Sequence, residues 1–263
     1  MLFERGDLVT RKSYNNDIVF RIEDIVDDTV ILIGINMRLC ADAKIDDLQE
    51  YEAGEDKKVE DDDSFFSKLN DYFNIDRNDY FYLPGRILHI DGDEEYLRRC
   101  LKFYKEGNVI AYGVHLKEDE MPSNIGTYLE DLKPDILVIT GHDAYYRKRG
   151  KSDEITSYKN TSNFIKTVVE ARKYEKAHDK LIVIAGACQS NYEALIRAGA
   201  NFASSPKRIN IHALDPAIIA LTISLSDRGK DIDLLGILDR TKYGASGMGG
   251  VITKGTMYIG YPR

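Results

Sequence analysis

The chain has 263 residues, 43% of them hydrophobic, which is enough for one large domain or for a small domain followed by a medium one. Its net charge of −8 argues against a general nucleic-acid-binding protein. No apolar run approaches the length of a membrane span, and the first residues lack the pattern of a secretory signal peptide. Three widely spaced cysteines, Cys40, Cys100 and Cys188, favour a reducing compartment over a disulfide framework.

Residues 1–50 are predicted to form a small SH3-like β-barrel. Short segments rich in aliphatic and β-branched residues alternate with Asn-Asn and Asp-Asp pairs that are typical of turns. The expected strands are 7–10, 17–22, 29–34 and 37–41. The composition then changes, and residues 51–80 are predicted to be a charged linker, with a short helix at 64–73.

Strands and helices alternate from residue 81 to residue 263, which predicts an α/β domain with a mostly parallel sheet flanked by helices. The expected strands are 86–90, 109–114, 136–139 and 181–184, and the expected helices are 94–105, 123–132, 161–178 and 191–198. Further along, the pattern predicts helices near 216–225 and 231–240, a glycine-rich loop at 244–250 and a final hairpin at 251–260.

Two of the apolar runs end at residues suited to nucleophilic catalysis. The run 136–139 leads to His142, and the run 181–184 leads to Cys188. In an open α/β sheet, reactive groups gather at the carboxyl ends of parallel strands, so His142 and Cys188 are expected on neighbouring strand ends. A thiolate attacks and a nearby imidazole takes its proton. A helix starting near Gln189 or Ser190 is expected to favour the thiolate through its dipole.

Other readings of these residues stay open. Cys188 also fits a buried core cysteine, which is a common environment for cysteine. Asp91 and Asp93 follow the first strand and fit a solvated turn, an anionic pocket or the Mg²⁺ site of a haloacid-dehalogenase-like phosphatase. A glutamine-amidotransferase-like elbow would need a second glycine after Cys188 and a histidine later in the chain. The observed order, histidine then cysteine, is that of caspase-like enzymes.

Several long segments resemble the YabG family of sporulation-specific cysteine proteases of endospore-forming bacteria. They are 6–14, 83–93, 133–145, 185–190, 196–206 and 210–216. The resemblance implies a caspase-like endopeptidase of the sporulating mother cell, associated with the forming spore coat. It implies cleavage after Arg in coat and cortex-associated proteins, with no cofactor or metal and no nucleic-acid or membrane partner. The family's histidine and cysteine map onto His142 and Cys188.

The resemblance also leads to expectations about the rest of the site. The backbone N–H groups of Cys188 and Asp143 are expected to stabilise the oxyanion, although a glycine usually stands in the place of Asp143. A buried substrate arginine requires a carboxylate, so Asp91 and Asp93 are the first candidates. Asp215 and Ser205 are the second candidates. A catalytically inactive coat assembly module is the non-enzyme alternative.

A basic loop at 145–150 follows His142. It is interpreted either as a solvated turn or as a self-cleavage segment, because it offers Arg147 and Arg149 to an enzyme expected to favour arginine.

Overall fold

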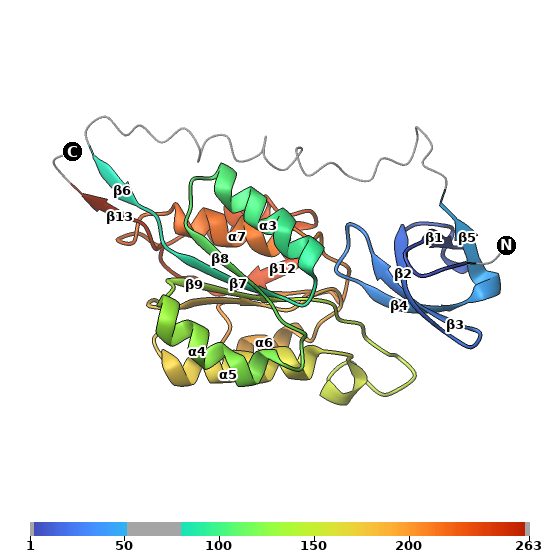
Figure 1. Ribbon diagram of the computed structural model, residues 1–263. Coiled ribbons are helices and arrows are strands. Elements are labelled where there is room, and N and C mark those ends of the chain that lie inside the picture. The colour runs from blue at the N-terminus through green and yellow to red at the C-terminus, as the bar shows by residue number, and fades with distance from the viewer. Residues whose placement is uncertain (1–2, 52–79, 261–263) are drawn as a thin grey trace.

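The computed structural model describes residues 3–51 and 80–260 (Figure 1). The first part is a five-stranded antiparallel sheet with the order β4-β3-β2-β1-β5. Its strands are β1 (Leu8–Arg11), β2 (Phe20–Val26), β3 (Thr29–Gly34), β4 (Cys40–Lys44) and β5 (Leu48–Glu50). Because β4 and β5 are the two edges, closure into an SH3-like barrel stays a prediction. The predicted linker and its helix at 64–73 lie almost entirely outside the described residues.

The second part is built on a six-stranded sheet with the order β12-β11-β10-β9-β7-β8. Its strands are β7 (Ile87–Asp91), β8 (Ala111–His115), β9 (Ile136–Thr140), β10 (Ile182–Ala185), β11 (Phe202–Ser204) and β12 (Met248–Gly250). All neighbours are parallel except β11 and β12. The central strands are buried along their whole length, which explains their continuous apolar sequences. The predicted mostly parallel sheet is confirmed.

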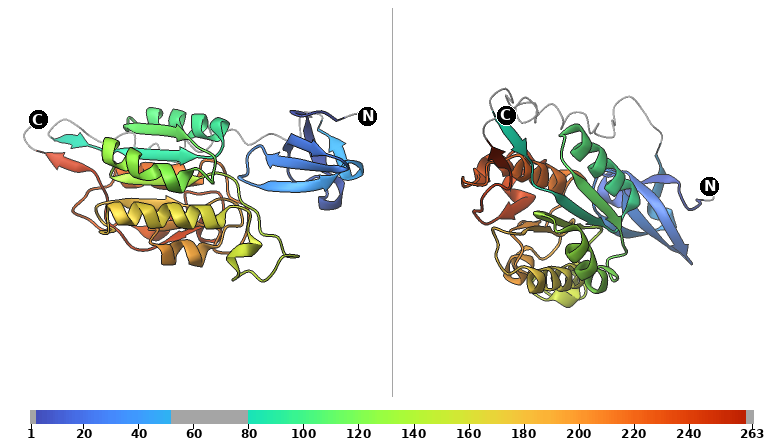
Figure 2. Two further views of the ribbon diagram at one scale, coloured as in Figure 1. Left: turned by 60° about the horizontal axis from the view of Figure 1, so that its bottom comes forward. Right: turned by 60° about the vertical axis from the view of Figure 1, so that its left-hand side comes forward.

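Helices cover both faces of this sheet (Figures 1 and 2). One face carries α3 (Glu94–Glu106) and α7 (Asp215–Ser224), and the other carries α4 (Met121–Leu132), α5 (Thr161–Tyr174) and α6 (Tyr192–Ala198). A short helix, α8 (Leu234–Leu238), follows α7. Every residue of α7 is buried, in keeping with a helix that is apolar on all sides. None of the helices among the described residues is both long and apolar enough to cross a membrane.

Several sequence predictions are wrong in detail. Residues 248–250 of the predicted glycine-rich loop form β12. There is no final hairpin at 251–260, because β12 pairs with β11 while β13 (Tyr258–Gly260) pairs with β6 (Phe81–Leu83). The predicted strand at 37–41 begins only at Cys40. The predicted helix 161–178 ends at Tyr174, where the chain turns extended at Glu175.

The connection between β3 and β4, here called the 35–39 loop, reaches the second part of the chain. The Tyr96 hydroxyl on α3 lies within hydrogen-bonding distance of the backbone carbonyls of Gly34 and Met37, and Arg99 donates to the Ile35 carbonyl at 2.9 Å. One apolar cluster contains core residues of both parts, among them Phe20 of the first part and Ile218 of the second. The five-stranded sheet is therefore packed against the carboxyl end of the parallel sheet.

Candidate active site

The structure brings His142 and Cys188 to the same edge of the sheet. They follow β9 and β10, which pair in parallel with Val138 opposite Ile184. Asp91 ends β7, the other neighbour of β9, and lies opposite Thr140. The neighbouring positions of the histidine, cysteine and aspartate strand ends are thus confirmed, as expected for parallel strands of similar length.

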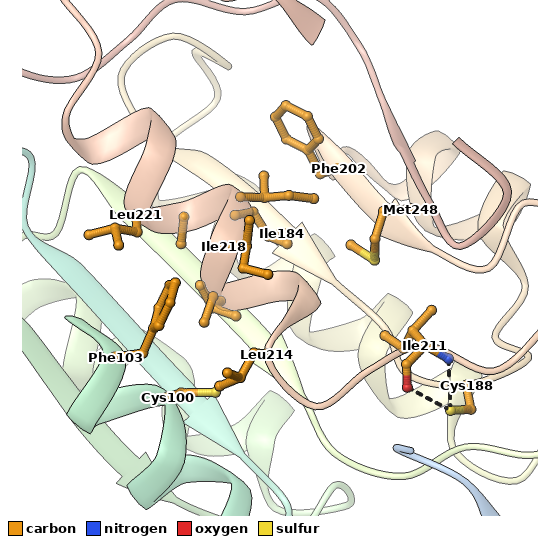
Figure 3. Packing of buried hydrophobic residues seen from close by; sticks show 14 of the residues in the cluster. Cys100, Phe103, Ile184, Cys188, Phe202, Ile211, Leu214, Ile218, Leu221 and Met248 are labelled. Carbon is orange, nitrogen blue, oxygen red and sulfur yellow. Dashed lines mark hydrogen bonds between the residues drawn. The ribbon is translucent and has the colours of Figure 1, made fainter. Parts of the chain in front are cut away.

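Cys188 lies in a tight turn rather than at the start of a helix. Gly186 and Gln189 both have positive φ angles (106° and 60°), and α6 begins only at Tyr192, with Asn191 as its N-cap. The prediction of a helix start at Gln189 or Ser190 is therefore wrong. The Cys188 thiol accepts a hydrogen bond from the Ile211 N–H at 3.2 Å and lies 3.5 Å from the Ile211 carbonyl (Figure 3). Burial raises the pKa of the Cys188 thiol, so the thiol is neutral in this state.

His142 is nearly buried beside α3. Its Nε2 lies 3.8 Å from Asp93 Oδ2 and has no hydrogen-bond partner among the described residues, and its ring packs on Tyr96 with centroids 5.3 Å apart. The backbone N–H of His142 donates to Glu118 Oε1 at 2.9 Å. Burial lowers the pKa of His142 to about 4, and the nearby Asp93 only partly offsets this. His142 is therefore a neutral imidazole at pH 7.

This buried imidazole is expected to make stability depend on pH. His142 titrates near 6.5 when unfolded and near 4 when folded, so the unfolded chain binds more protons between these values. The contribution of the neutral His142 to the free energy of unfolding is complete above pH 6.5 and is lost as the pH falls toward 4. Urea unfolding of the wild type and of His142→Asn at pH 7.5 and 5.0 measures this. The wild type should lose about 2 kcal/mol more than the variant, at 1.36 kcal/mol per pKa unit. If the wild type and His142→Asn lose the same free energy of unfolding between pH 7.5 and 5.0, the assignment of this pH dependence to His142 is wrong.

Asp143 ties the histidine loop to the cysteine turn. Its buried carboxylate accepts hydrogen bonds from the Asn160 N–H at 2.8 Å, from the Ser190 hydroxyl at 2.8 Å and from the Thr161 hydroxyl. Its backbone lies in a parallel bridge with Leu39 of the 35–39 loop. Burial raises the pKa of Asp143 and these hydrogen bonds oppose that rise. The carboxylate thus fixes the spacing of the loops that carry His142 and Cys188.

Asp91 is paired with an arginine from the other part of the chain. Arg38 and Asp91 are both fully buried, and Arg38 Nη1 donates to Asp91 Oδ2 at 2.7 Å. Arg38 Nε and Nη2 both donate to the Ala213 carbonyl, at 3.1 and 2.8 Å. The guanidinium also lies 5.0 Å from the centre of the Tyr96 ring. Arg38 and Asp91 thus form a buried ion pair close to the strand ends that lead to His142 and Cys188, and every charged group in it has a partner.

The other predicted binding residues have different surroundings. Asp93 caps α3 by accepting from the Tyr96 N–H and lies next to His142. Buried Asp215 accepts from the backbone N–H groups of His212 and Lys242, and burial raises its pKa to about 6. The Ser205 hydroxyl donates to the Ile209 carbonyl at 2.6 Å. Asp215 and Ser205 therefore shape the segment 209–214, which runs past Cys188.

Sequence reasoning missed two elements of this site. Arg38 was assigned to a strand of the barrel, although a single arginine among apolar residues was a signal of pairing. Around the segment 209–213, only Ser205 and Asp215 were considered as binding residues, although the backbone of this segment contacts both Cys188 and Arg38. His89, also on β7, is buried, and its two ring nitrogens lie 2.9 Å from the Tyr104 hydroxyl and 3.0 Å from the Thr140 hydroxyl.

The basic loop after His142 lies on the surface. Arg147, Lys148 and Arg149 are exposed and line a pocket together with Cys40 and Gln189. Self-cleavage of this loop stays a prediction.

A family model described as YabG peptidase U57 matches residues 4–262. The chain belongs to this family. The sporulation-specific protease YabG of Bacillus subtilis is 41% identical over 286 aligned positions, which cover 100% of this chain and 99% of that protein. The YabG-family member described here is accordingly a protease, a hydrolase of protein substrates. No solved structure matches the chain. Among the described residues there is no cluster of three or more potential metal ligands.

Proposed function

We propose that this chain is a cysteine endopeptidase that uses Cys188 and His142 and cleaves after arginine. The single observation that carries this proposal is the buried guanidinium site at Asp91, next to the strand ends of His142 and Cys188. A buried cation requires a paired anion, and Asp91 together with the Ala213 carbonyl meets that requirement for arginine. Arginine suits this arrangement better than lysine, because its fork of donors reaches both acceptors at once.

The chemistry follows from the groups present. The Cys188 sulfur attacks the carbonyl carbon of the substrate arginine and forms a tetrahedral intermediate. The Cys188 N–H, with the Asp143 N–H as the second donor, stabilises its oxyanion. His142 transfers the thiol proton to the leaving amine as the C–N bond breaks. Water then hydrolyses the thioester, which releases the new carboxylate and restores the thiol.

The biological setting in this proposal comes from the family. The relative in Bacillus subtilis is named a sporulation-specific protease. We extend that name to proteins of the spore coat and cortex as substrates, and to the mother cell of a sporulating bacterium as the place of action. These partners are proteins, in line with the acidic net charge of −8, which disfavours nucleic acid.

One assay tests the chemistry. Purified protein is incubated with matched fluorogenic peptides that end in Arg, Lys or Asp, with and without iodoacetamide or EDTA. We expect cleavage of the Arg peptide, inhibition by iodoacetamide with carboxamidomethylation of Cys188, and no effect of EDTA. Cleavage blocked by EDTA but not by iodoacetamide would replace this mechanism with a metal-dependent one. A protein that cleaves no peptide and no spore coat protein would support the inactive assembly module instead.

A further inference from the structure

The 35–39 loop crosses the proposed active site in the manner of a bound peptide. The Arg38 N–H donates to the Ile211 carbonyl at 3.4 Å, and the Ala213 N–H donates to the Asn36 carbonyl at 3.1 Å. Between them, Met37 and His212 form an antiparallel bridge. The loop therefore pairs with the segment 211–213 as an added strand, which is a general way for proteins to bind extended peptides.

The same loop places a carbonyl at the catalytic turn. The Cys188 N–H donates to the Arg38 carbonyl at 3.3 Å. Under the proposed mechanism this N–H is a donor for the oxyanion of the peptide bond being cut. The side chain of Arg38 occupies the Asp91 pocket at the same time. Both the carbonyl and the side chain of Arg38 thus stand where a substrate residue before the cut would stand.

The next residue continues this pattern. Leu39 lies in a bridge with Asp143, on the loop that carries His142. The Leu39 nitrogen is the amine half of the peptide bond that follows Arg38. It therefore lies on the same side as His142, which would protonate the leaving amine under the proposed mechanism. Cys188 is fully buried with this loop in place.

We propose that the 35–39 loop is a tethered inhibitor, which fills the substrate cleft in the register of a substrate with Arg38 as the residue before the cut. This inference rests on the proposed function and adds its regulation. The enzyme is latent while the loop is seated, and a protein substrate gains access only when the five-stranded sheet releases it. The loop also assigns the subsites: Asp91 and the Ala213 carbonyl bind the residue before the cut, and the segment 211–213 binds the backbone before it.

The first test opens the cleft. In Arg38→Ala the Asp91 pocket is vacated, and the carboxylate is left to bind an arginine ligand. Two quantities should each rise by about 10-fold or more: the rate of Cys188 modification by an arginine chloromethyl ketone, and kcat/KM for an Arg peptide. This magnitude follows if the loop is released in at most about a tenth of wild-type molecules. Arg5→Ala is the matched control, because it removes an arginine of the same five-stranded sheet that pairs with Glu23 on the surface. It should stay at the wild-type rate.

The second test locks the cleft and leaves the Arg38–Asp91 pair intact. Met37 and His212 are a non-hydrogen-bonded antiparallel pair, whose Cα separation of about 4.5 Å suits a disulfide. Met37→Cys/His212→Cys should lose Arg-peptide cleavage on oxidation and regain it with reductant, whereas each single variant and the wild type should respond alike to both treatments.

The outcomes separate the two claims. If Arg38→Ala and the oxidised double variant both cleave the Arg peptide at the wild-type rate, the tethered inhibitor is wrong and the proposed function stands. If no variant cleaves the peptide or reacts with the arginine reagent at Cys188, the proposed function itself is wrong.

Discussion

Replacing Cys188 with alanine is expected to abolish proteolysis, with a loss in kcat of about 10⁴-fold or more, as for other nucleophiles that form a covalent intermediate. The alanine lacks the sulfur that forms the thioester, while its small apolar side chain fits the buried turn. His142→Ala should approach the same loss, because the leaving amine then has no proton donor. The measurement is hydrolysis of an Arg peptide by the purified variants.

Cys40 provides the matched control for this experiment. It is also a buried free cysteine, but it lies on β4, where the Lys159 ammonium contacts its sulfur at 2.8 Å. Cys40→Ala should keep activity close to that of the wild type. A Cys188→Ala protein that hydrolyses the peptide at the wild-type rate would show that the nucleophile lies elsewhere in the chain.

The second large effect is expected at Asp91. Asp91→Asn removes the negative charge from the guanidinium pocket, and kcat/KM for Arg peptides should fall by about 10²–10³-fold if 3–4 kcal/mol of a desolvated ion pair is lost. Reaction of Cys188 with a small alkylating reagent should persist, because this reagent does not use the pocket.

Asp91→Asn also leaves the buried Arg38 without its partner, and breaking such a pair typically costs about 3–5 kcal/mol of folding stability. The double variant Arg38→Met/Asp91→Asn removes the stranded cation and should recover much of this stability without recovering cleavage after Arg. Urea unfolding and peptide kinetics on the same samples distinguish the two effects. If Asp91→Asn cleaves Arg peptides at the wild-type rate, the pocket for the residue before the cut lies elsewhere.

The parts of the fold that sequence predicted well are governed by local patterns. The runs 136–139 and 181–184 are continuous and apolar because their strands are buried on both faces, so their ends, and hence the adjacency of His142 and Cys188, were predictable. The expected helix start at Gln189 or Ser190 lies one or two residues before Asn191, which is the residue that caps α6.

The remaining features depend on contacts between distant residues. Arg38 meets Asp91 across 53 positions and the Ala213 carbonyl across 175, and no local pattern around residue 38 encodes either partner. For the same reason the environment of Cys188 was misjudged: its turn is covered by the segment at Ile211 and by the 35–39 loop. The last strand likewise pairs with Phe81–Leu83 rather than with its neighbour in sequence.

That last pairing determines where a fusion partner is best attached. β6 precedes β7, so β13 lies at the amino end of the central strands, and the two-stranded ribbon stands opposite the five-stranded sheet (Figure 1). His142 and Cys188, by contrast, lie beyond the carboxyl end of those strands. An affinity tag or fluorescent protein joined after β13 is therefore separated from the edge that carries His142 and Cys188 by the length of the parallel sheet. Labelling or immobilisation through that end should leave the proposed substrate cleft accessible to protein substrates.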